Sequence, residues 1–287
     1  MSAELPGGPT VRRILLGAQL RRLREAAGIT RETAGYHIRG SDSKISRMEL
    51  GRVGFKERDV ADLLTLYGVT AEEDRTTILG LVSEANSPGW WHRYNDILPP
   101  WFETYVGMEE AASRIRTYEV QFVPGLLQTE DYARAVMGPE RLGISEDEIE
   151  KRVAVRMSRQ RRLNQPDPLL LWAVVDEAVL HRRIGGPDVM CAQLKHLIEV
   201  AELPNVTLQV LPFSYGGHAA EGGAFSLLRY SEPDLPDIVY VEQLTGALYL
   251  DKREDVDSYV ETMEHLAVQA ATPEKSLELL RDIAEDT

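Results

Sequence analysis

Residues 41–50 read SDSKISRMEL, a short segment in which serine, aspartate and arginine side chains surround Ile45 and Met48. In a helix these two apolar residues, three positions apart, face inward and the polar side chains share the outer face. The planar guanidinium of Arg47 can donate two hydrogen bonds to O6 and N7 of guanine, and a serine hydroxyl reaches a base edge or a phosphate. We therefore predict that four side chains read DNA bases: Arg47, Ser43, Ser46 and Asp42.

The flanking side chains suit contacts with phosphate oxygens. Cationic and hydroxyl groups bind the DNA backbone and orient a protein on the duplex without specifying sequence. We predict such contacts for five residues: Arg31, Ser41, Lys44, Arg52 and Lys56. Two roles stay open for Asp42, because its carboxylate can cap the start of a helix or accept a hydrogen bond from cytosine N4.

Charge is unevenly distributed along the chain. The net charge of −14 is by itself unfavourable for binding nucleic acid. Residues 11–58, however, contain 12 Lys or Arg against 5 Asp or Glu, which leaves 20 against 41 for the rest. The sequence therefore predicts a small basic head that binds double-stranded DNA, joined to an acidic body. We expect a homodimer, because two reading helices then engage half-sites about one helical turn apart.

Helices are expected to position these side chains. An apolar face that ends at Gly28 predicts a first helix, Thr30 caps a second, and Gly40 makes the tight turn into Ser41, which caps a third. Two more helices are expected at 57–67 and 71–85. We predict a flexible tail at residues 1–10 and an all-α, five-helix, helix-turn-helix domain at residues 11–86.

The rest of the chain predicts an α+β domain. Residues 87–100 contain Pro, Gly and adjacent tryptophans and are predicted to be a linker to a regulatory domain at 101–287. Its expected helices lie at 101–120, 129–137, 145–164, 187–203 and 253–285, and its expected strands at 169–176, 206–212, 224–230, 238–242 and 247–250. Close spacing of the last four strands predicts an antiparallel meander, so the sheet is expected to be mainly antiparallel.

Composition argues against several classes of protein. The chain has no apolar run long enough to span a membrane and no secretion signal, so we expect a cytoplasmic protein. The single cysteine, Cys191, predicts a core thiol. Asp176, Glu177 and His181 could suggest metal ligands, but no paired Cys/His pattern supports them. We expect no metal, no cofactor, no catalytic residue and no enzyme activity.

A second class of function stays open. His218 lies among glycines, and four aromatic side chains could line a ligand pocket: Trp90, Trp91, Trp101 and Tyr105. These features allow a DNA-tethered small-molecule sensor or hydrolase as the alternative hypothesis. The helical stretch at 254–285 also allows two interpretations: its apolar residues form a dimer interface, or they belong to the hydrophobic core of one chain.

The N-terminal segment resembles the Xre or Cro-repressor family of helix-turn-helix regulators. The resemblance covers about residues 15–70 and is carried by LRRLREAAGITRETAG and SDSKISRMELGR. It implies a Cro/repressor-like fold and an internal ion pair between Arg24 and Glu49 that supports the reading helix.

The remainder resembles the C-terminal domain of actinobacterial antitoxin-like regulators, including WhiJ-like ones. The matching segments are GWWHRY (89–94), YEVQFVPGLLQTEDYAR (118–134), LLLWAVVDEAVLHRRIGG (169–186), NVTLQVLPF (205–213), GGAFSLL (222–228) and VYVEQLTGALYLD (239–251). This resemblance implies a transcriptional regulator controlled by a small acidic partner protein encoded nearby.

Overall fold

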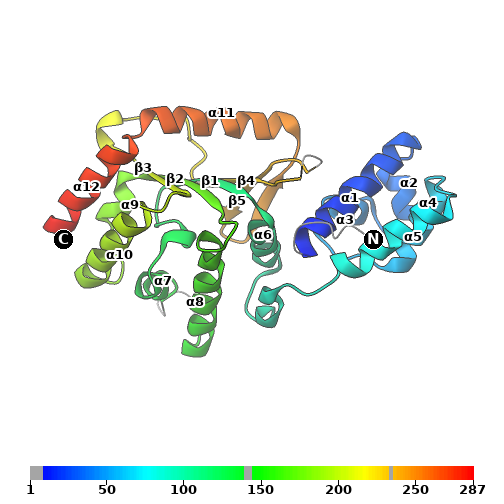
Figure 1. Ribbon diagram of the computed structural model, residues 1–287, viewed down its shortest axis with the longest axis horizontal. Helices are drawn as coiled ribbons and strands as arrows, with labels where there is room; N and C mark the ends of the chain where they lie inside the picture. The colour runs from blue at the N-terminus through cyan, green and yellow to red at the C-terminus, as the bar shows by residue number, and fades with distance from the viewer. Residues whose placement is uncertain (1–8, 139–143, 233–234) are drawn as a thin grey trace. The chain divides into compact units, whose positions relative to one another are not determined.

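The computed structural model describes residues 9–138, 144–232 and 235–287 (Figure 1). These residues form two compact units. The first contains residues 9–93 together with short later segments, and the second contains most of residues 112–287. No helix of the described residues is both long and apolar enough to cross a membrane.

The first unit is helical. Its elements are α1 (Pro9–Ala26), α2 (Arg31–His37), α3 (Asp42–Glu49), α4 (Glu57–Leu66) and α5 (Glu72–Ala85). They enclose one apolar core, to which each helix contributes, for example Leu16, Ile45 and Leu63, all at most 1% exposed. Pro9 and Thr10 already belong to α1, so the predicted tail of residues 1–10 was too long, and residues 1–8 lie outside the described residues.

Capping residues set the limits of these short helices. The hydroxyl of Thr30 accepts a hydrogen bond from the Thr33 amide, and Gly28 has a φ of 66° after α1, both as predicted. The turn between α2 and α3 differs, because the left-handed residue is Arg39, with a φ of 53°, and not Gly40. The Gly40 amide bonds to the Gly35 carbonyl, which closes the turn around Arg39.

Close backbone contact fixes α3 against α1. A Cβ atom added to Gly17 would lie 2.4 Å from the carbonyl oxygen of Met48, so only glycine fits at this crossing. Ile45 and Met48 are buried on the same side of α3, which leaves the opposite side of the helix exposed.

The second unit contains a mixed sheet with the strand order β3-β2-β1-β4-β5-β6. The strands are β1 (Arg114–Glu119), β2 (Leu170–Asp176), β3 (Val206–Leu211), β4 (Phe225–Arg229), β5 (Ile238–Gln243) and β6 (Gly246–Leu250). Pairings β3–β2 and β2–β1 are parallel, and the other three are antiparallel. The predicted four-strand meander was wrong for β3, because helix α10 carries the chain from β2 to a parallel position beside it.

Helices cover both faces of this sheet. The helices that follow α5 along the chain are α6 (Pro100–Ala111), α7 (Glu130–Val136), α8 (Glu146–Gln160), α9 (Glu177–His181), α10 (Pro187–Val200), α11 (Arg253–Gln269) and α12 (Pro273–Asp286). The 3-10 turns are η1 (Trp90–Tyr94), η2 (Gly125–Leu127), η3 (Arg161–Leu163) and η4 (Phe213–Tyr215). Figure 1 shows α11 along one face, with α8 and α10 on the other. Two predicted helices were too long: residues 101–120 end at Ala111 and continue as β1, and 253–285 break between α11 and α12.

The buried side of α11 resolves one open question. Val256, Met263 and Leu266 are at most 8% exposed and pack against the sheet with Tyr118 and Val239. These three apolar residues of α11 are therefore core residues of one chain, which favours the second of the two interpretations for them.

Candidate nucleic-acid interface

The outer face of α3 is exposed and polar. Asp42, Ser43 and Arg47 are exposed, Ser46 is half-buried, and the preceding Ser41 is exposed. The structure therefore brings the four predicted base-reading side chains to one helix, on the side opposite Ile45 and Met48. Among the described residues, Arg47 forms no ion pair, so its exposed guanidinium is available to a ligand.

Local hydrogen bonds organise the start of α3. The Ser41 hydroxyl accepts a hydrogen bond of 3.2 Å from the Lys44 amide and so caps the helix. The Ser43 hydroxyl donates to the Asp42 carboxylate at 3.2 Å. Asp42 thus lies in the first turn, where a negative charge is favourable. Its carboxylate also accepts the hydrogen bond that the Ser43 hydroxyl of the reading face donates.

One hydrogen bond links α2 to the reading face. The Arg31 guanidinium donates to the Ser46 hydroxyl at 3.3 Å, and both groups belong to the predicted contact set. A phosphate contact by Arg31 and a base or phosphate contact by Ser46 would therefore occur at neighbouring points on DNA.

The remaining predicted phosphate contacts lie in different surroundings. The Lys44 ammonium is 2.5 Å from the Asp59 carboxylate of α4, so phosphate oxygens would have to compete with that carboxylate. Arg52 is half-buried, and its amide bonds to the Arg47 carbonyl at the end of α3. Lys56 is exposed immediately before α4. Of these three, Lys56 has the most accessible charge.

A buried ion pair supports α3 from within. Arg24 donates from Nε to Glu49 Oε1 at 2.5 Å and from a terminal nitrogen to Oε2 at 3.0 Å, and a further bond of 2.9 Å reaches the Ile29 carbonyl. The two side chains are only 10% and 5% exposed. The hydrogen bond with Glu49 raises the pKa of Arg24 above its ordinary value. The pair therefore ties the end of α3 to the end of α1.

Three further candidates near this face escaped the sequence analysis. Tyr36, on α2, is 86% exposed, and His37 and Arg39 beside it are also exposed. Arg39 keeps a left-handed backbone that favours glycine, and a strained residue of this kind often has a functional reason. The sequence signal for Arg39 was an arginine at a position of the turn that glycine usually occupies.

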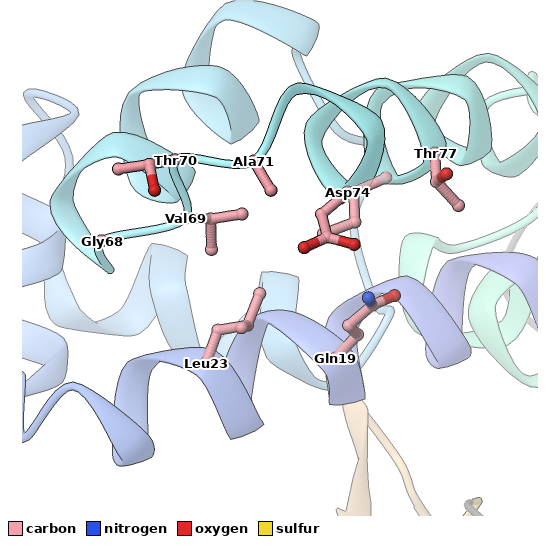
Figure 2. Close-up of a pocket in the computed structure, with 9 residues that line it drawn as sticks. Gln19, Leu23, Gly68, Val69, Thr70, Ala71, Asp74 and Thr77 are labelled. Atoms are coloured by element: carbon pink, nitrogen blue, oxygen red, sulfur yellow. The ribbon is translucent and has the colours of Figure 1, made fainter.

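A hollow of about 450 Å³ lies elsewhere in the helical unit (Figure 2). Figure 2 shows Gln19 and Leu23 of α1 facing Val69 and Asp74 across it. Its size suits a small ligand, but Asp74 is the only charged residue in its lining. None of the predicted DNA contacts lines it.

The polar side chains of the second unit that suggested other chemistry have structural partners. Asp176 accepts a hydrogen bond from the Ala178 amide, and Glu177 accepts one from the Phe213 amide. His181 lies 3.2 Å from Glu177. Within the described residues, no group of three or more His, Cys, Asp or Glu side chains is arranged to hold a metal ion.

Three of the side chains considered for a ligand pocket also have partners. His218 accepts from the Ala220 amide on Nδ1, so its neutral form carries the proton on Nε2 and donates it to the Tyr118 hydroxyl at 3.0 Å. Trp90 donates to Glu110, and Tyr105 stacks on Tyr240 with ring centroids 4.1 Å apart.

One acidic side chain in the second unit titrates unusually. Burial, followed by the nearby charge of Glu242, raises the pKa of Glu119 to about 8, and the guanidinium groups of Arg156 and Arg159 oppose this shift. Arg159 is itself buried and lies over the ring of Tyr105 at 5.3 Å. The end of β1 therefore holds a carboxyl group that is largely protonated at neutral pH.

Comparison with known protein families matches both units. The family described as "Domain of unknown function (DUF5753)" matches residues 102–282, which is more than half of the chain. The chain belongs to this DUF5753 family. A second family, described as "Helix-turn-helix domain", matches residues 15–76. Neither the curated proteins nor the solved structures that were compared give a match.

The helix-turn-helix match runs from residue 15, within α1, to the start of α5 and includes the whole exposed face of α3. This DUF5753 protein therefore has an N-terminal domain of a class that binds DNA, which supports a DNA-binding regulator. The family description of the C-terminal domain assigns it no activity.

Proposed function

We propose that this chain is a sequence-specific, homodimeric transcriptional regulator of the Xre or Cro-repressor type, with α3 as its reading helix. Its C-terminal domain is an antitoxin-like, WhiJ-like regulatory domain that binds a small protein partner encoded nearby. It acts in the cytoplasm and is not an enzyme.

The exposed polar face of α3 carries this proposal. Arg47 is exposed, and Ile45 and Met48 hold the opposite face in the core. A reading helix needs this combination, because base edges must be reached by side chains whose backbone is held firmly. The Arg24–Glu49 pair supplies part of that support.

The regulatory role of the C-terminal domain rests on the resemblance of its sequence to antitoxin-like regulators. The alternative sensor or hydrolase relied on His218 and on the aromatic residues near the linker. Because His218 bonds to Tyr118 and to the Ala220 amide, its nitrogen atoms have structural roles that explain the residue without catalysis. We therefore favour a binding domain.

Replacing Arg47 with alanine tests the reading helix. DNA sites are first selected from a random pool by the full chain, and binding is then measured by fluorescence anisotropy over a range of salt concentrations. Arg47→Ala should lose about 1–3 kcal/mol of discrimination at one base pair. Arg253→Ala is the matched control, because this arginine has a 93% exposed side chain in the other domain.

The control should leave both affinity and base preference unchanged. If Arg47→Ala also leaves both unchanged, α3 is not the reading helix. Loss of affinity without any change in base preference would reassign Arg47 to a phosphate contact.

A further inference from the structure

The hollow of about 450 Å³ in the helical unit has an apolar end and a polar end. Figure 2 shows Leu23 and Val69 at one end, and Gln19 and Asp74 at the other. Its volume lies within the range of about 300–1000 Å³ that is typical of sites for small molecules. Such sites combine apolar walls with a few polar groups that orient the ligand, and this lining has the same composition.

The carboxylate of Asp74 is available to a ligand. Asp74 is exposed in the first turn of α5 and forms no ion pair or hydrogen bond with another described residue. The neighbouring cation, Arg75, donates its terminal nitrogens to the carbonyl oxygens of Ala61 and Val69 instead. A bound cation therefore would not have to displace Arg75 from Asp74.

The side chain of Gln19 adds a second polar group at the same end. It projects from α1 on the opposite side of the hollow from Asp74 (Figure 2). Gln19 is half-buried, and its carboxamide makes no hydrogen bond with another described residue. Its carbonyl oxygen and the two oxygens of Asp74 can all accept hydrogen bonds. The polar end therefore suits a ligand group that carries several N–H donors and a positive charge.

We propose that this hollow binds a small organic cation, a primary amine that carries an apolar body. The ammonium group donates hydrogen bonds to the Asp74 carboxylate and to the Gln19 carbonyl oxygen, and its charge strengthens the first of these bonds. The apolar body lies against Leu23, Val69 and Ile78. Ile78 is only 3% exposed and belongs to the core of the unit, so it provides a fixed apolar contact.

Charge favours this class of ligand over others. Asp74 is the only charged residue of the lining, so an anion would meet a negative charge with no cation of the lining to compensate it. A neutral ligand of the same shape would displace water from the carboxylate without supplying an opposite charge. The inference goes beyond the proposed function, because none of the predicted DNA contacts lines the hollow.

Phenethylamine and 2-phenylethanol provide matched probes, because they share a phenyl body and only the amine is charged at neutral pH. Each is titrated into the isotope-labelled full chain, and its Kd is taken from the chemical-shift changes of backbone amides in α1 and α5. Asp74→Asn removes the charge, and Thr77→Trp fills the hollow from an exposed position. Glu73→Gln is the matched control, because Glu73 is an exposed carboxylate of the same turn that does not line the hollow.

We expect the amine to shift the amides around the hollow until saturation and to bind at least about tenfold more tightly than the alcohol. Asp74→Asn should raise the Kd of the amine at least about tenfold and leave that of the alcohol unchanged. Thr77→Trp should abolish binding of both probes, and Glu73→Gln should bind both like the wild type. Asp74 and Thr77 are exposed, so neither change should disturb the core, and the amide spectra verify this.

Two kinds of result would overturn the inference. Shifts that do not saturate, or that persist unchanged in Thr77→Trp, would show that the hollow is not the binding site. An amine that binds no better than the alcohol, or equally well to Asp74→Asn, would show that the Asp74 charge does not select the ligand. DNA binding is measured separately through Arg47, so neither result bears on the reading helix.

Discussion

Breaking the buried ion pair should destabilise the helical unit strongly. Arg24→Met keeps an unbranched apolar stem but removes the guanidinium, which leaves the Glu49 carboxylate without its two hydrogen bonds of 2.5 and 3.0 Å. Water cannot replace them, because the Glu49 side chain is only 5% exposed. Removing one partner of a buried pair costs about 3–5 kcal/mol. That is a large share of the roughly 5–15 kcal/mol that stabilises a typical domain.

Hydrogen exchange measured by mass spectrometry on the full chain reports this loss where it occurs. Peptides from α1 and α3 should lose protection, whereas peptides from the sheet should not. Arg21→Met is the matched control, because the Arg21–Glu25 pair has side chains that are 49% and 53% exposed. A pair of that kind contributes only about 0.3–0.5 kcal/mol.

A double substitution separates the net contribution of the pair from the penalty of breaking it. Arg24→Met combined with Glu49→Leu removes both charges, so it should restore most of the stability that either single change loses. The reasoning fails if Arg24→Met costs no more than Arg21→Met. It also fails if the double variant is as unstable as the sum of its parts.

Two further predictions concern single residues. Arg39→Gly should stabilise the helical unit by about 1 kcal/mol, because glycine adopts a φ of 53° without strain, and the change is measured as a rise in melting temperature. Glu119→Gln should flatten the pH dependence of stability. The pKa of Glu119 is raised to about 8, so the folded protein favours the protonated carboxyl group. The stability that this group contributes is fully present below the ordinary pKa near 4.5 and is lost as the pH rises through 8. Melting curves should show the wild type losing stability between these values, and the variant melting at least about 3 °C higher at pH 8.

Much of the helical unit could be predicted from local sequence. Thr30 and Ser41 are good capping residues, Gly28 ends a helix, and apolar spacing marks the core face of α3. These signals are local, because a helix satisfies its hydrogen bonds within its own segment. The engagement of Lys44 with Asp59 was not predictable, since it depends on how closely α4 approaches α3.

The sheet was harder to predict because its partners are distant in sequence. β1 follows α6 with only Ala112 and Ser113 between them, and neither residue is a strong breaker, so a continuous helix was expected. The strand exists because β2 and β4 pair with its two sides. By contrast, the break between α11 and α12 has a local signal in Thr272 and Pro273, although one continuous helix was predicted there.

The position of β1 at the centre of the sheet also determines when the second unit can fold during synthesis. Its two neighbours come much later in the chain, and β4 emerges from the ribosome only after β2, α10 and β3. The helical unit depends on contacts between neighbouring segments and can fold as soon as α5 has been made. A nascent chain can therefore fold its helix-turn-helix unit before the six-stranded sheet of the second unit can be completed.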